Sequence, residues 1–502
     1  MKLPGPGTLV LLRKLDEYLS GKGIESYIVG GFVRDMLLER QTVDLDIAVA
    51  ADASETAAGT ADFFGGKYVL LDDENGVARV VLTVKQESSE IRVIDFSSYG
   101  GSIGKDLARR DFTVDAMAVG LGRFVSGPAE VEIVDPFHGR EDIERKLLRA
   151  VKDTVFALDA ARLLRAVRLA AELGFTIEEQ TEDLVKEYAH LVFDVPGERI
   201  RDEVLRLLAL PGAAGTLVYL DRLGLLTGIF PDLEESRGVE QPKEHFWDVL
   251  EHSLATVKAL EFLLGEGDWD YVAEEIRAAD AFSEQVRDHL DREVSSGSTR
   301  KILLKLAALL HDVGKPGTKG IDDSGRMRFL GHNKEGVELV TGMLERLRFT
   351  GKEIRIMETA VGSHMRPTQM SQPGELPTDR AIYRYFRDTG DTGLDILLLS
   401  LADHLAAKGP ELSLDGWREH ANLVEYVIGK NSEKETVIDP PKIVDGYDIM
   451  KYFEVNPGPQ IGEVLEAVRE AQASGDITSR AEALSYIEKL LKSDGFPKTD
   501  TV

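Results

Sequence analysis

Two aspartates near the start of the chain, Asp44 and Asp46, are well suited to metal chemistry. Residues 44–49 alternate between polar and apolar types, which is typical of a β-strand. The alternation places both carboxylates on one face of the strand and apolar residues on the other, toward the core. Two adjacent carboxylates repel each other unless a divalent cation lies between them, and oxygen ligands suit Mg²⁺ that carries substrate phosphates.

A pair of glycines precedes these aspartates. Gly30 and Gly31 follow residues 27–29, which have the composition of a strand end, and residues 32–39 can form a helix. Glycine lets the backbone approach a bulky anion, and a helix N-terminus favours negative charge. A phosphate-binding turn beside paired carboxylates is the combination that nucleotidyl transfer needs. A plain turn beside a surface acidic pair is the alternative for each part taken alone.

Five ordered motifs in roughly the first 210 residues resemble those of class II tRNA nucleotidyltransferases and bacterial poly(A) polymerases. The first is the segment from Gly30 to Asp46. The others, in chain order, are Asp106–Ala116, Asp135–Arg149, Asp159–Phe175 and Glu198–Glu203. Their order and spacing make the resemblance specific.

The resemblance implies an α/β nucleotidyltransferase head, similar to polymerase β, followed by all-α neck, HD and C-terminal helical domains. The expected boundaries are 1–150 for the head, 151–235 for the neck, 245–410 for the HD domain and 411–490 for the C-terminal helical region. In the head we expect strands at 27–29, 44–49, 77–84, 91–96 and 131–134. From about residue 151 the apolar spacing becomes helical and strand signals vanish.

The resemblance assigns Asp44 and Asp46 to catalysis and to binding Mg²⁺. Asp95, at the end of the predicted strand 91–96, is the candidate third metal ligand, and an aspartate that caps a turn is the alternative. The implied nucleotide-binding residues are Gly30, Gly31, Arg34, Arg109, Arg110, Asp111, Asp159, Arg162, Arg165 and Arg168. As alternatives, Asp35 supports Arg34 structurally, and residues 109–111 form an internal ion-pair hub.

Asp159 and Arg162 are expected on one helix, three residues apart, so both project to one edge. A carboxylate accepts from an exocyclic amine and a guanidinium donates to a ring nitrogen, which selects C and A over U and G. In the resembled family such a pair is a protein template for the incoming base. Two residues depart from the family pattern: Leu158 replaces a glutamate, and Asp115 replaces an asparagine. The first concerns the tuning of base choice, and the second a hydrogen bond to the ribose or a supporting loop.

A second set of metal-ligand types lies in the other half of the chain. The series His252, His311, Asp312, His332, His364 and Asp403, with the context Leu309-Leu-His-Asp-Val-Gly-Lys-Pro316, resembles the HD-type metal phosphohydrolases. Imidazole and carboxylate ligands on packed helices suit a transition metal or Mg²⁺. His332 and His364 are candidate ligands of a second metal. A relic scaffold without activity is the alternative to a phosphoesterase.

Composition narrows the remaining classes. The 502-residue chain has no cysteine, which excludes disulfides and a cysteine nucleophile. It has no apolar run of about 18 residues and no secretory signal pattern at its start, so we expect a cytoplasmic protein without a membrane partner. The net charge of −28 argues against indiscriminate nucleic-acid binding. Basic residues concentrated between 109 and 206 predict an RNA-directing stripe, with solvated helix faces as the alternative.

These features together predict template-independent addition of C, A or both to the 3′ end of tRNA or another RNA, with ATP and CTP as substrates. A poly(A) polymerase shares the same motifs. A regulatory nucleotidyltransferase–HD signalling enzyme is disfavoured because its motifs around the glycine pair would differ. A nuclease or phosphatase whose head only binds RNA is disfavoured by the intact Asp44 and Asp46.

Overall fold

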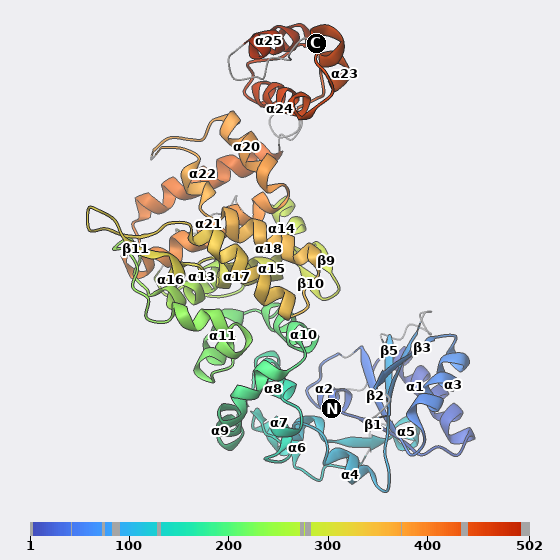
Figure 1. The fold of residues 1–502 in the computed structure, drawn as a ribbon. Helices are drawn as coiled ribbons and strands as arrows, with labels where there is room; N and C mark the ends of the chain where they lie inside the picture. Colours follow the sequence, from blue (N-terminus) through green and yellow to red (C-terminus); the bar gives the residue numbers. More distant parts are fainter. Residues whose placement is uncertain are drawn as a thin grey trace. The chain divides into compact units, whose positions relative to one another are not determined.

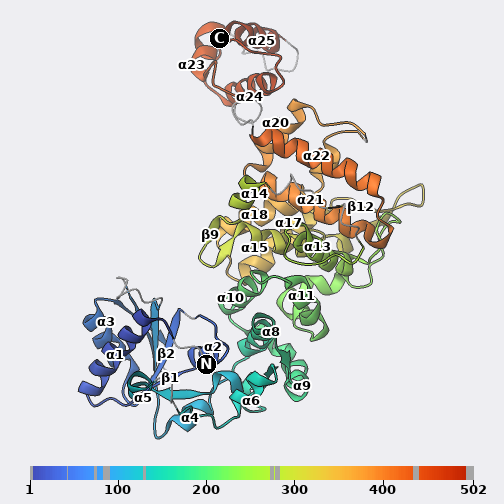
Figure 2. The same cartoon turned by 180° about the vertical axis from the view of Figure 1, so that it is seen from behind.

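A computed structural model of the chain (Figure 1, and Figure 2 from behind) describes residues 4–41, 43–72, 76–82, 91–127, 132–271, 276, 283–372, 374–432 and 440–492. The chain divides into two compact units. Residues 1–195 and 223–228 form the first, and residues 196–222 and 229–502 form the second. Within the described residues, no helix has the length and apolar content needed to cross a membrane.

The first unit is built on a six-stranded sheet in the order β3-β4-β5-β2-β1-β6. The strands are β1 (Ser26–Val29), β2 (Asp44–Val49), β3 (Lys67–Asp72), β4 (Val77–Val81), β5 (Val93–Ser98) and β6 (Ala118–Gly120). Strands β2 and β5 run parallel, and the other neighbouring pairs are antiparallel. Helix α3 (Ala53–Phe64) packs against β3, β4 and β5, whereas α2 (Gly31–Leu37) contacts β1 and β2 (Figure 1).

The two faces of β2 differ as its sequence predicts. Leu45, Ile47 and Val49 are fully buried, while Asp44 is exposed and Asp46 is half-buried on the opposite face. That opposite face continues into a buried apolar cluster formed by Val29, Ala48, Leu107, Ala116 and Ala118. The carboxylates therefore border a packed cluster, which fixes the strand that carries them.

Several strand predictions need correction. Strand β3 was missed because almost all of its residues are exposed and show no alternation, and β6 is only three residues long. Residue 131 lies outside the described residues, and Val134 forms only an isolated bridge with Ala118, so 132–134 is not a strand. The predicted strand 77–84 ends at Val81 in β4, and residues 83 and 84 lie outside the described part.

Helices follow the head sheet in the first unit. They include α7 (Val155–Leu158), α8 (Ala161–Leu173) and α9 (Glu179–Tyr188). Helix α8 ends at Gly174, whose φ of 68° suits a left-handed C-cap. A two-residue strand β8 (Thr176–Ile177) pairs in parallel with β7 (Leu147–Leu148), a small β element that helical periodicity did not predict.

The second unit is mainly helical. It begins with α10 (Gly197–Leu208) and α11 (Ala213–Arg222), and its HD region contains α13 (Val249–Leu263), α15 (Arg300–Leu310), α17 (His332–Arg346), α18 (Gly351–Ser363) and α21 (Thr392–Lys408). Helix α13 packs on α15 and α21, and α18 packs on α15, α17 and α21. The all-helical pattern expected for 245–410 is interrupted by two hairpins, β9–β10 (Glu293–Ser295, Ser298–Thr299) and β11–β12 (Lys319–Ile321, Met327–Phe329).

The C-terminal helices α23 (Gly446–Phe453), α24 (Pro459–Ala473) and α25 (Arg480–Lys492) enclose an apolar cluster of their own. Their contact with α20 (Asp379–Thr389) is ionic. Arg380 and Arg384 pair with Glu470 at 3.4 and 2.5 Å, and Arg387 pairs with Glu466 at 3.2 Å.

A buried carboxylate joins three elements of the second unit. Glu353 of α18 is fully buried, and its Oε1 accepts hydrogen bonds from Arg201 Nη2 of α10 at 2.7 Å, Ser295 Oγ at 2.7 Å and Ser298 Oγ at 2.6 Å. Its Oε2 accepts from the Thr350 backbone N–H at the start of α18. One side chain thus links α10, the β9–β10 hairpin and α18.

We predict that Glu353→Ala destabilises the protein by about 3 kcal/mol, because Arg201 loses its buried partner. Burial raises the pKa of Glu353, but hydrogen bonds from Arg201, Ser298 and Ser295 outweigh it and lower the pKa to about 2. The ionised group therefore stabilises the fold at neutral pH, and this stability is lost as the pH falls from about 5 toward about 2. Melting temperatures measured across this range should fall less steeply for the variant.

The exposed Glu345 of α17 offers a control. Glu345→Ala should melt like the wild type at neutral pH. Equal neutral-pH stability of Glu353→Ala and the wild type would contradict the assigned role of Glu353.

Candidate functional site

Three predicted carboxylates lie together on the polar face of the head sheet. Asp46 of β2 is the direct neighbour of Asp95 on β5, and Asp44 lies two residues earlier on the same face as Asp46. Arg79, opposite Asp95 on β4, binds both oxygens of Asp95 at 2.8 Å. The Asp95 carboxylate is thus already paired with the Arg79 guanidinium, and its role as a metal ligand stays a prediction.

The charge of Asp46 is incompletely compensated. Burial raises its pKa to about 6, although Arg110 opposes the rise, and Asp95 adds to it. A divalent cation would stabilise the ionised form, and the carboxylate oxygens suit Mg²⁺. Among the described residues, however, three ligand atoms within 4.8 Å of one another are found only in the second unit. The case for a metal ion in the head therefore rests on two observations. Asp44 and Asp46 share one strand face, and the charge of Asp46 is incompletely compensated.

Gly30 permits the close packing of this face. Its φ of 69° and ψ of −141° are readily adopted only by glycine. A Cβ atom there would lie 2.8 Å from Arg110 Nη1 and 2.9 Å from Asp46 Oδ2. A Cβ atom at Gly31, the first residue of α2, would likewise lie 3.3 Å from Arg34 Nη2. The glycine pair therefore lets the turn lie directly against the charged side chains.

Arg34 is held by carboxylates on both sides. Its Nη1 donates to Asp115 Oδ1 at 2.7 Å and its Nε donates to Asp35 Oδ1 at 2.9 Å. The Arg34 side chain is only 8% exposed. The structural pairing with Asp35 is thus present, and a contact between Arg34 and a triphosphate stays a prediction.

The second motif surrounds the same face. Arg110 pairs with Asp106 at 3.3 Å and lies beside Gly30, whereas Arg109 is exposed. Asp111 is buried and accepts from Arg165 Nε at 2.7 Å. Burial opposes its ionisation, but Arg165 and then Arg162 hold the pKa of Asp111 below its usual value. The ion pairs expected as the alternative for residues 109–111 are therefore present, and nucleotide contacts by Arg109, Arg110 and Asp111 stay predictions.

Asp159 and Arg162 lie close together, but not on one helix as predicted. Asp159 has extended backbone between α7 and α8, and Arg162 lies in the first turn of α8. Arg162 Nε is 3.6 Å from Asp159 Oδ2, and Arg162 Nη2 donates to the Arg109 carbonyl at 3.2 Å. The predicted helix begins too early, at Asp159, because the alanines at 160 and 161 continue the helical pattern. The expected proximity of Asp159 and Arg162 is present.

The next two arginines of α8 differ from each other. The Arg165 side chain is 37% exposed, while Arg168 is buried and pairs with Glu172 at 2.6 Å. Three-residue spacing therefore did not place all three arginines on an accessible face. A nucleotide contact by Arg168 stays a prediction.

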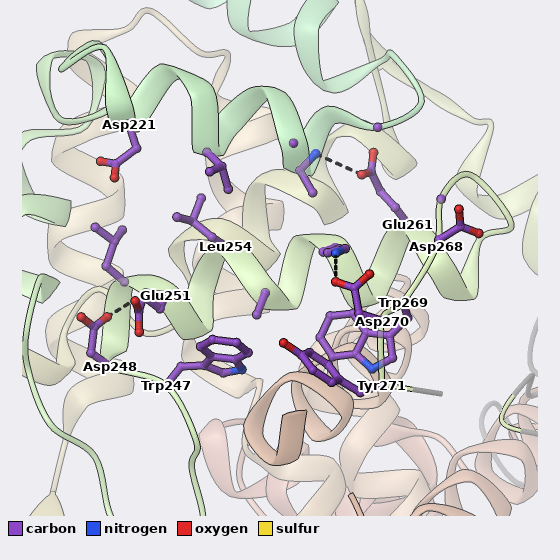
Figure 3. A pocket seen from close by; sticks show the side chains of 18 of the residues that line it. Asp221, Trp247, Asp248, Glu251, Leu254, Glu261, Asp268, Trp269, Asp270 and Tyr271 are labelled. Atoms are coloured by element: carbon purple, nitrogen blue, oxygen red, sulfur yellow. Dashed lines mark hydrogen bonds and ion pairs between the residues drawn. The ribbon is translucent and has the colours of Figure 1, made fainter. Parts of the chain in front are cut away.

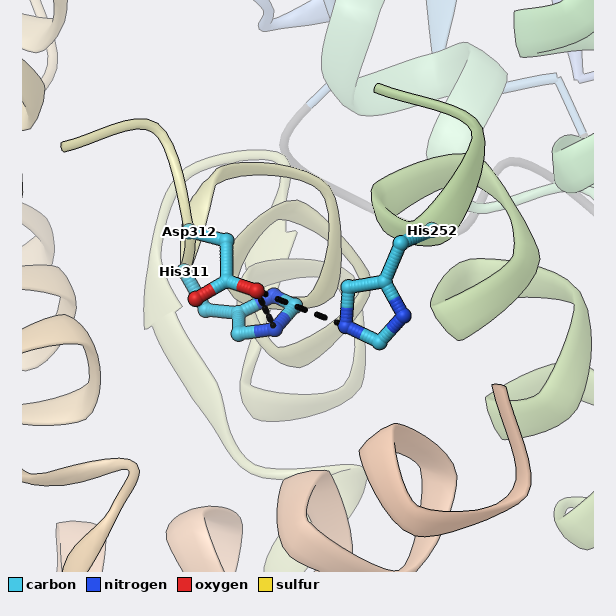
Figure 4. Close-up of side chains that lie close together, drawn as sticks. All are labelled: His252, His311 and Asp312. Atoms are coloured by element: carbon cyan, nitrogen blue, oxygen red, sulfur yellow. Dashed lines mark ion pairs between the residues drawn. The ribbon is translucent and has the colours of Figure 1, made fainter. Parts of the chain in front are cut away.

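In the second unit, the predicted histidines and aspartates converge on one centre. His252 comes from α13, Asp403 from α21, and His311 and Asp312 directly follow α15. His252 Nε2 and His311 Nε2 lie 3.4 and 3.2 Å from Asp312 Oδ2 (Figure 4). His252 Nε2 also lies 3.0 Å from Asp403 Oδ1. These atoms form a first group of ligands.

The other oxygen of Asp312 faces a second group. His332, the first residue of α17, and His364, which follows α18, each place Nε2 at 3.6 Å from Asp312 Oδ1. The two Nε2 atoms are 3.2 Å apart. One carboxylate thus lies between two pairs of histidines, as a ligand bridging two metals would.

Hydrogen bonding fixes which ring nitrogens are available. Nδ1 of His311, His332 and His364 faces the carbonyls of Ala308, Phe329 and Val361 at 3.0, 2.7 and 2.7 Å. Each Nδ1 must donate to its carbonyl, so each neutral ring presents an Nε2 lone pair toward the centre. Lone pairs that face one another repel, and a metal ion between them would remove this repulsion.

Unsatisfied atoms support the same conclusion. In the described part of the chain, His252 Nε2, His311 Nε2 and Asp312 Oδ1 are buried without hydrogen-bond geometry to any partner. Burial lowers the pKa of His364 to about 4 and also lowers the pKa of His332 and His252, which keeps these rings neutral. The pKa of His311 is raised by Asp312 despite burial. The donor set fits one or two metal ions.

Sequence reasoning missed three neighbours of this centre. Lys315 Nζ lies 2.5 Å from Asp312 Oδ2 and donates to Gln241 Oε1 at 2.7 Å. His245 packs against His252 with ring centroids 5.3 Å apart. Lys315 is three residues after Asp312, a spacing that the sequence already contained, whereas Gln241 and His245 come from an irregular segment that carried no signal.

A separate cavity of about 640 Å³ lies between α11, α13 and the segment that ends at Tyr271 (Figure 3). Trp247, Trp269 and Tyr271 contribute aromatic walls. Its acidic residues outnumber its two basic ones, Arg237 and Lys258, which pair with Asp221 and Asp270. A triphosphate requires cationic surroundings, so this cavity is not a nucleotide site.

Three family models match successive parts of the chain. They are a poly(A) polymerase head domain at 26–149, a probable RNA- and SrmB-binding site of polymerase A at 174–236, and an HD domain at 249–408. An A-adding tRNA nucleotidyltransferase of Deinococcus radiodurans is 35% identical over 470 residues, covering 92% of this chain and 94% of that protein. The chain belongs to the tRNA nucleotidyltransferase family. It is therefore a nucleotidyltransferase, as the motifs predicted.

Further comparisons agree with the assignment to the tRNA nucleotidyltransferase family. A CC-adding enzyme of Thermus thermophilus is 32% identical, covering 92% of this chain and 93% of that protein. The fold is shared with a Thermotoga maritima CCA-adding enzyme complexed with tRNA, with a TM-score of 0.62 and 22% identity, covering 97% and 96% of the two chains. A CCA-adding enzyme structure with CTP gives a TM-score of 0.65 and 22% identity over the same shares. The predicted fold class is confirmed.

We predict that His311→Ala abolishes transition-metal retention at the HD centre, because the first group loses an imidazole and Asp312 loses its neighbour. The purified protein should contain less than about a tenth of the wild-type metal, since removal of a ligand weakens metal binding by more than the 10–100-fold typical of an outer-shell partner. Elemental analysis after gel filtration measures the effect. His190→Ala, at an exposed histidine, should retain the wild-type content, and so would His311→Ala if the centre did not bind metal.

Proposed function

We propose that this chain adds C, A or both to the 3′ end of tRNA by metal-dependent nucleotidyl transfer, with ATP and CTP as the nucleotides. The observation that carries the proposal is the carboxylate face of β2 and β5, with Arg110 and Gly30 beside Asp46. The Asp159–Arg162 pair is joined to the same motif through the Arg109 carbonyl. Phosphate chemistry and base selection can thus occur within one unit. A cytoplasmic location follows from this substrate and is part of the proposal.

In the proposed reaction the tRNA 3′-hydroxyl attacks the α-phosphorus of the nucleotide, and pyrophosphate leaves. Mg²⁺ bound by Asp44 and Asp46 would lower the charge of the phosphates and the pKa of the hydroxyl. Asp44 and Asp46 hold the reacting groups at the strand edge, and Arg110 lies beside Asp46 to balance charge. The glycine turn brings the N-terminus of α2 against Asp46 and Arg110, and the backbone N–H groups there can bind the triphosphate.

Base selection is assigned to Asp159 and Arg162. The Arg109 carbonyl anchors one end of the Arg162 guanidinium, and Asp159 lies 3.6 Å from its Nε. The Asp159 side chain is 28% exposed and the Arg162 side chain is 22% exposed. A base that enters beside them can donate its amine to the carboxylate and accept from the guanidinium, which C and A do and U and G do not.

Several relatives that are at least 30% identical over most of the chain favour a partial specificity. An A-adding enzyme and two CC-adding enzymes each cover at least 92% of this chain. A CCA-adding enzyme of Geobacillus matches 50% of the chain in sequence, and the CCA-adding enzymes that share the fold over 97% of the chain are 22% identical. We propose that this chain completes one part of the CCA sequence. Three tRNA transcripts, lacking CCA, CA or A, incubated with each NTP alone and in mixtures, show which part.

A poly(A) polymerase would extend every transcript beyond one or three nucleotides without stopping, and that outcome would replace the proposal. A signalling nucleotidyltransferase would extend none of them. The same extension assay therefore distinguishes both alternatives from the proposed function.

The bridged geometry of the HD centre supports a second activity, hydrolysis of a phosphomonoester or a 2′,3′-cyclic phosphate. Asp312 lies between two histidine pairs, an arrangement suited to two metals that activate water and bind the phosphate. The metal, a transition metal or Mg²⁺, is part of this proposal. His311→Ala should lose hydrolysis and keep nucleotide addition, because the head carboxylates need no imidazole.

We predict that Asp46→Ala lowers nucleotide addition by at least about a thousandfold, since the metal loses a ligand on which charge stabilisation depends. Asp44→Ala should behave similarly. Single-turnover extension of tRNA measures the rate, and circular dichroism checks the fold. The exposed Asp62 of α3 gives a matched control in the same unit, and Asp62→Ala should retain the wild-type rate. Near-normal rates for either site variant would refute the site.

Arg162→Ala and Asp159→Ala should loosen base choice more than they weaken triphosphate binding. Loss of one polar partner in a desolvated site costs about 1–3 kcal/mol, which corresponds to roughly five- to 150-fold in discrimination. The kcat/KM values for CTP, ATP, UTP and GTP, measured separately on one transcript, give the ranking. If both variants kept the wild-type ranking, the protein-template assignment would be wrong.

A further inference from the structure

The cavity beside α13 lies outside the HD centre and is lined by the second unit alone (Figure 3). Its volume is about 640 Å³, and none of the predicted metal ligands lines it. Helix α13 contributes to both places, because His252 faces the metal ligands whereas Glu251 and Leu254 line the cavity. A molecule bound here would therefore lie against the helix that carries His252, outside the metal site.

One side of the cavity is a row of three aromatic rings. Tyr271 lies between two indoles, with its ring centroid 6.2 Å from that of Trp247 and 5.6 Å from that of Trp269 (Figure 3). Val218 of α11, which is 43% exposed, and Leu254 of α13 complete the apolar lining. Water in this cavity contacts apolar surface, and a ligand with an apolar segment would cover that surface.

Carboxylates lie at both ends of the aromatic row. Asp248 and Glu251, at the start of α13, are at one end, and Asp268 is at the other (Figure 3). Asp268 follows Gly267, which lies beside Glu261 in the last turn of α13. At the helical rise of about 1.5 Å per residue, positions 251 and 261 are about 15 Å apart along the axis. We call Asp248, Glu251 and Asp268 the end carboxylates.

The basic residues of the lining do not balance the end carboxylates. Arg237 and Lys258 already pair with Asp221 at 2.7 Å and with Asp270 at 2.5 Å. In the part of the chain that the structure describes, no lysine, arginine or histidine pairs with an end carboxylate. Both ends of the cavity therefore keep a net negative charge, which attracts cations.

These features define the chemistry of a ligand. The negative ends select against nucleotides, phosphates and carboxylic acids, and a compact ion such as Mg²⁺ would leave the apolar lining in contact with water. A linear organic cation meets both requirements. Its ammonium groups can pair with the end carboxylates, and the methylenes next to each ammonium can pack on the aromatic rings.

We propose that the cavity binds a linear polyamine. One ammonium group lies at Asp248 and Glu251, another lies at Asp268, and the methylene chain between them packs along Tyr271 and Leu254. The site is separate from the HD metal centre and from the nucleotide site, so the proposal does not depend on nucleotidyl transfer.

Calorimetric titration of the full-length protein with spermidine, at an ionic strength of about 0.15 M, tests the proposal. Diffuse attraction to the acidic protein is screened beyond about 8 Å under these conditions, so saturable binding reports a defined site. We expect one spermidine per chain. Glu251→Gln and Asp268→Asn should each raise the Kd about three- to tenfold, more than for a fully exposed ion pair, because the cavity excludes much of the water. Their effects should multiply in the double variant, since the two residues lie at opposite ends.

Tyr271→Leu tests the aromatic contact without a change of charge, and it should raise the Kd about three- to tenfold through loss of a cation–π contact. Butylamine has a single ammonium group and reaches only one end, so it should bind at least about tenfold more weakly than spermidine. Glu345→Gln removes one charge from an exposed position of α17 outside the cavity and should bind spermidine like the wild type. Melting temperatures without ligand check that each variant folds.

An absence of saturable binding to the wild type would overturn the proposal. An unchanged Kd in Glu251→Gln, Asp268→Asn or Tyr271→Leu would do the same, as would equal affinity for butylamine and spermidine. A loss in Glu345→Gln as large as in the cavity variants would indicate general charge attraction and would also overturn it. A lysine-containing peptide that bound more tightly than spermidine would assign the cavity to a partner protein in place of a polyamine.

Discussion

The ionised carboxylates on the polar face of the head sheet constrain the rest of the first unit. A buried or half-buried negative charge is costly unless cations and hydrogen-bond donors surround it. Asp95 and Asp115 meet this requirement with arginines from β4, α2 and α8, whereas Arg110 of the second motif only partly compensates Asp46, whose pKa stays raised. Residues far apart in the sequence are thereby drawn to one strand edge, and the spacing of the motifs reflects this charge balance.

The HD centre satisfies the same constraint differently. Three of its imidazoles have Nδ1 bound to backbone carbonyls. His311 and His364 are bound to carbonyls in the last turns of α15 and α18, and His332 is bound to a carbonyl in β12, so the backbone sets the orientation of these rings. Asp312 carries charge at the middle of the group, partly balanced by Lys315. The centre is thus built from rigid elements of a single unit and needs nothing from the head.

Much of this arrangement could be predicted from sequence, and the exceptions have identifiable causes. The face of β2 follows from strict alternation, and the ligand series of the HD centre follows from residue type and order. Strand β3 was missed because exposure on a sheet edge removes alternation. Asp159 was expected on a helix because its alanine neighbours have high helix propensity. In the structure its backbone is extended after the end of α7, and its side chain accepts from the Ala161 N–H. The sealing of Arg34 by Asp115 joins residues 81 positions apart, which no local pattern reveals.

The C-terminal helices α23–α25 have a core of their own and contact α20 through polar and charged side chains. Their apolar cluster is internal, so their folding depends on hydrophobic burial, which moderate salt hardly affects. Their contact with α20 includes a hydrogen bond from Tyr383 to Glu466 and several ion pairs of partly exposed arginines, and salt screens such ion pairs over a Debye length of about 8 Å at physiological ionic strength. Ionic strength therefore acts on the attachment of these helices and leaves their internal structure intact, so the two properties can change independently in evolution.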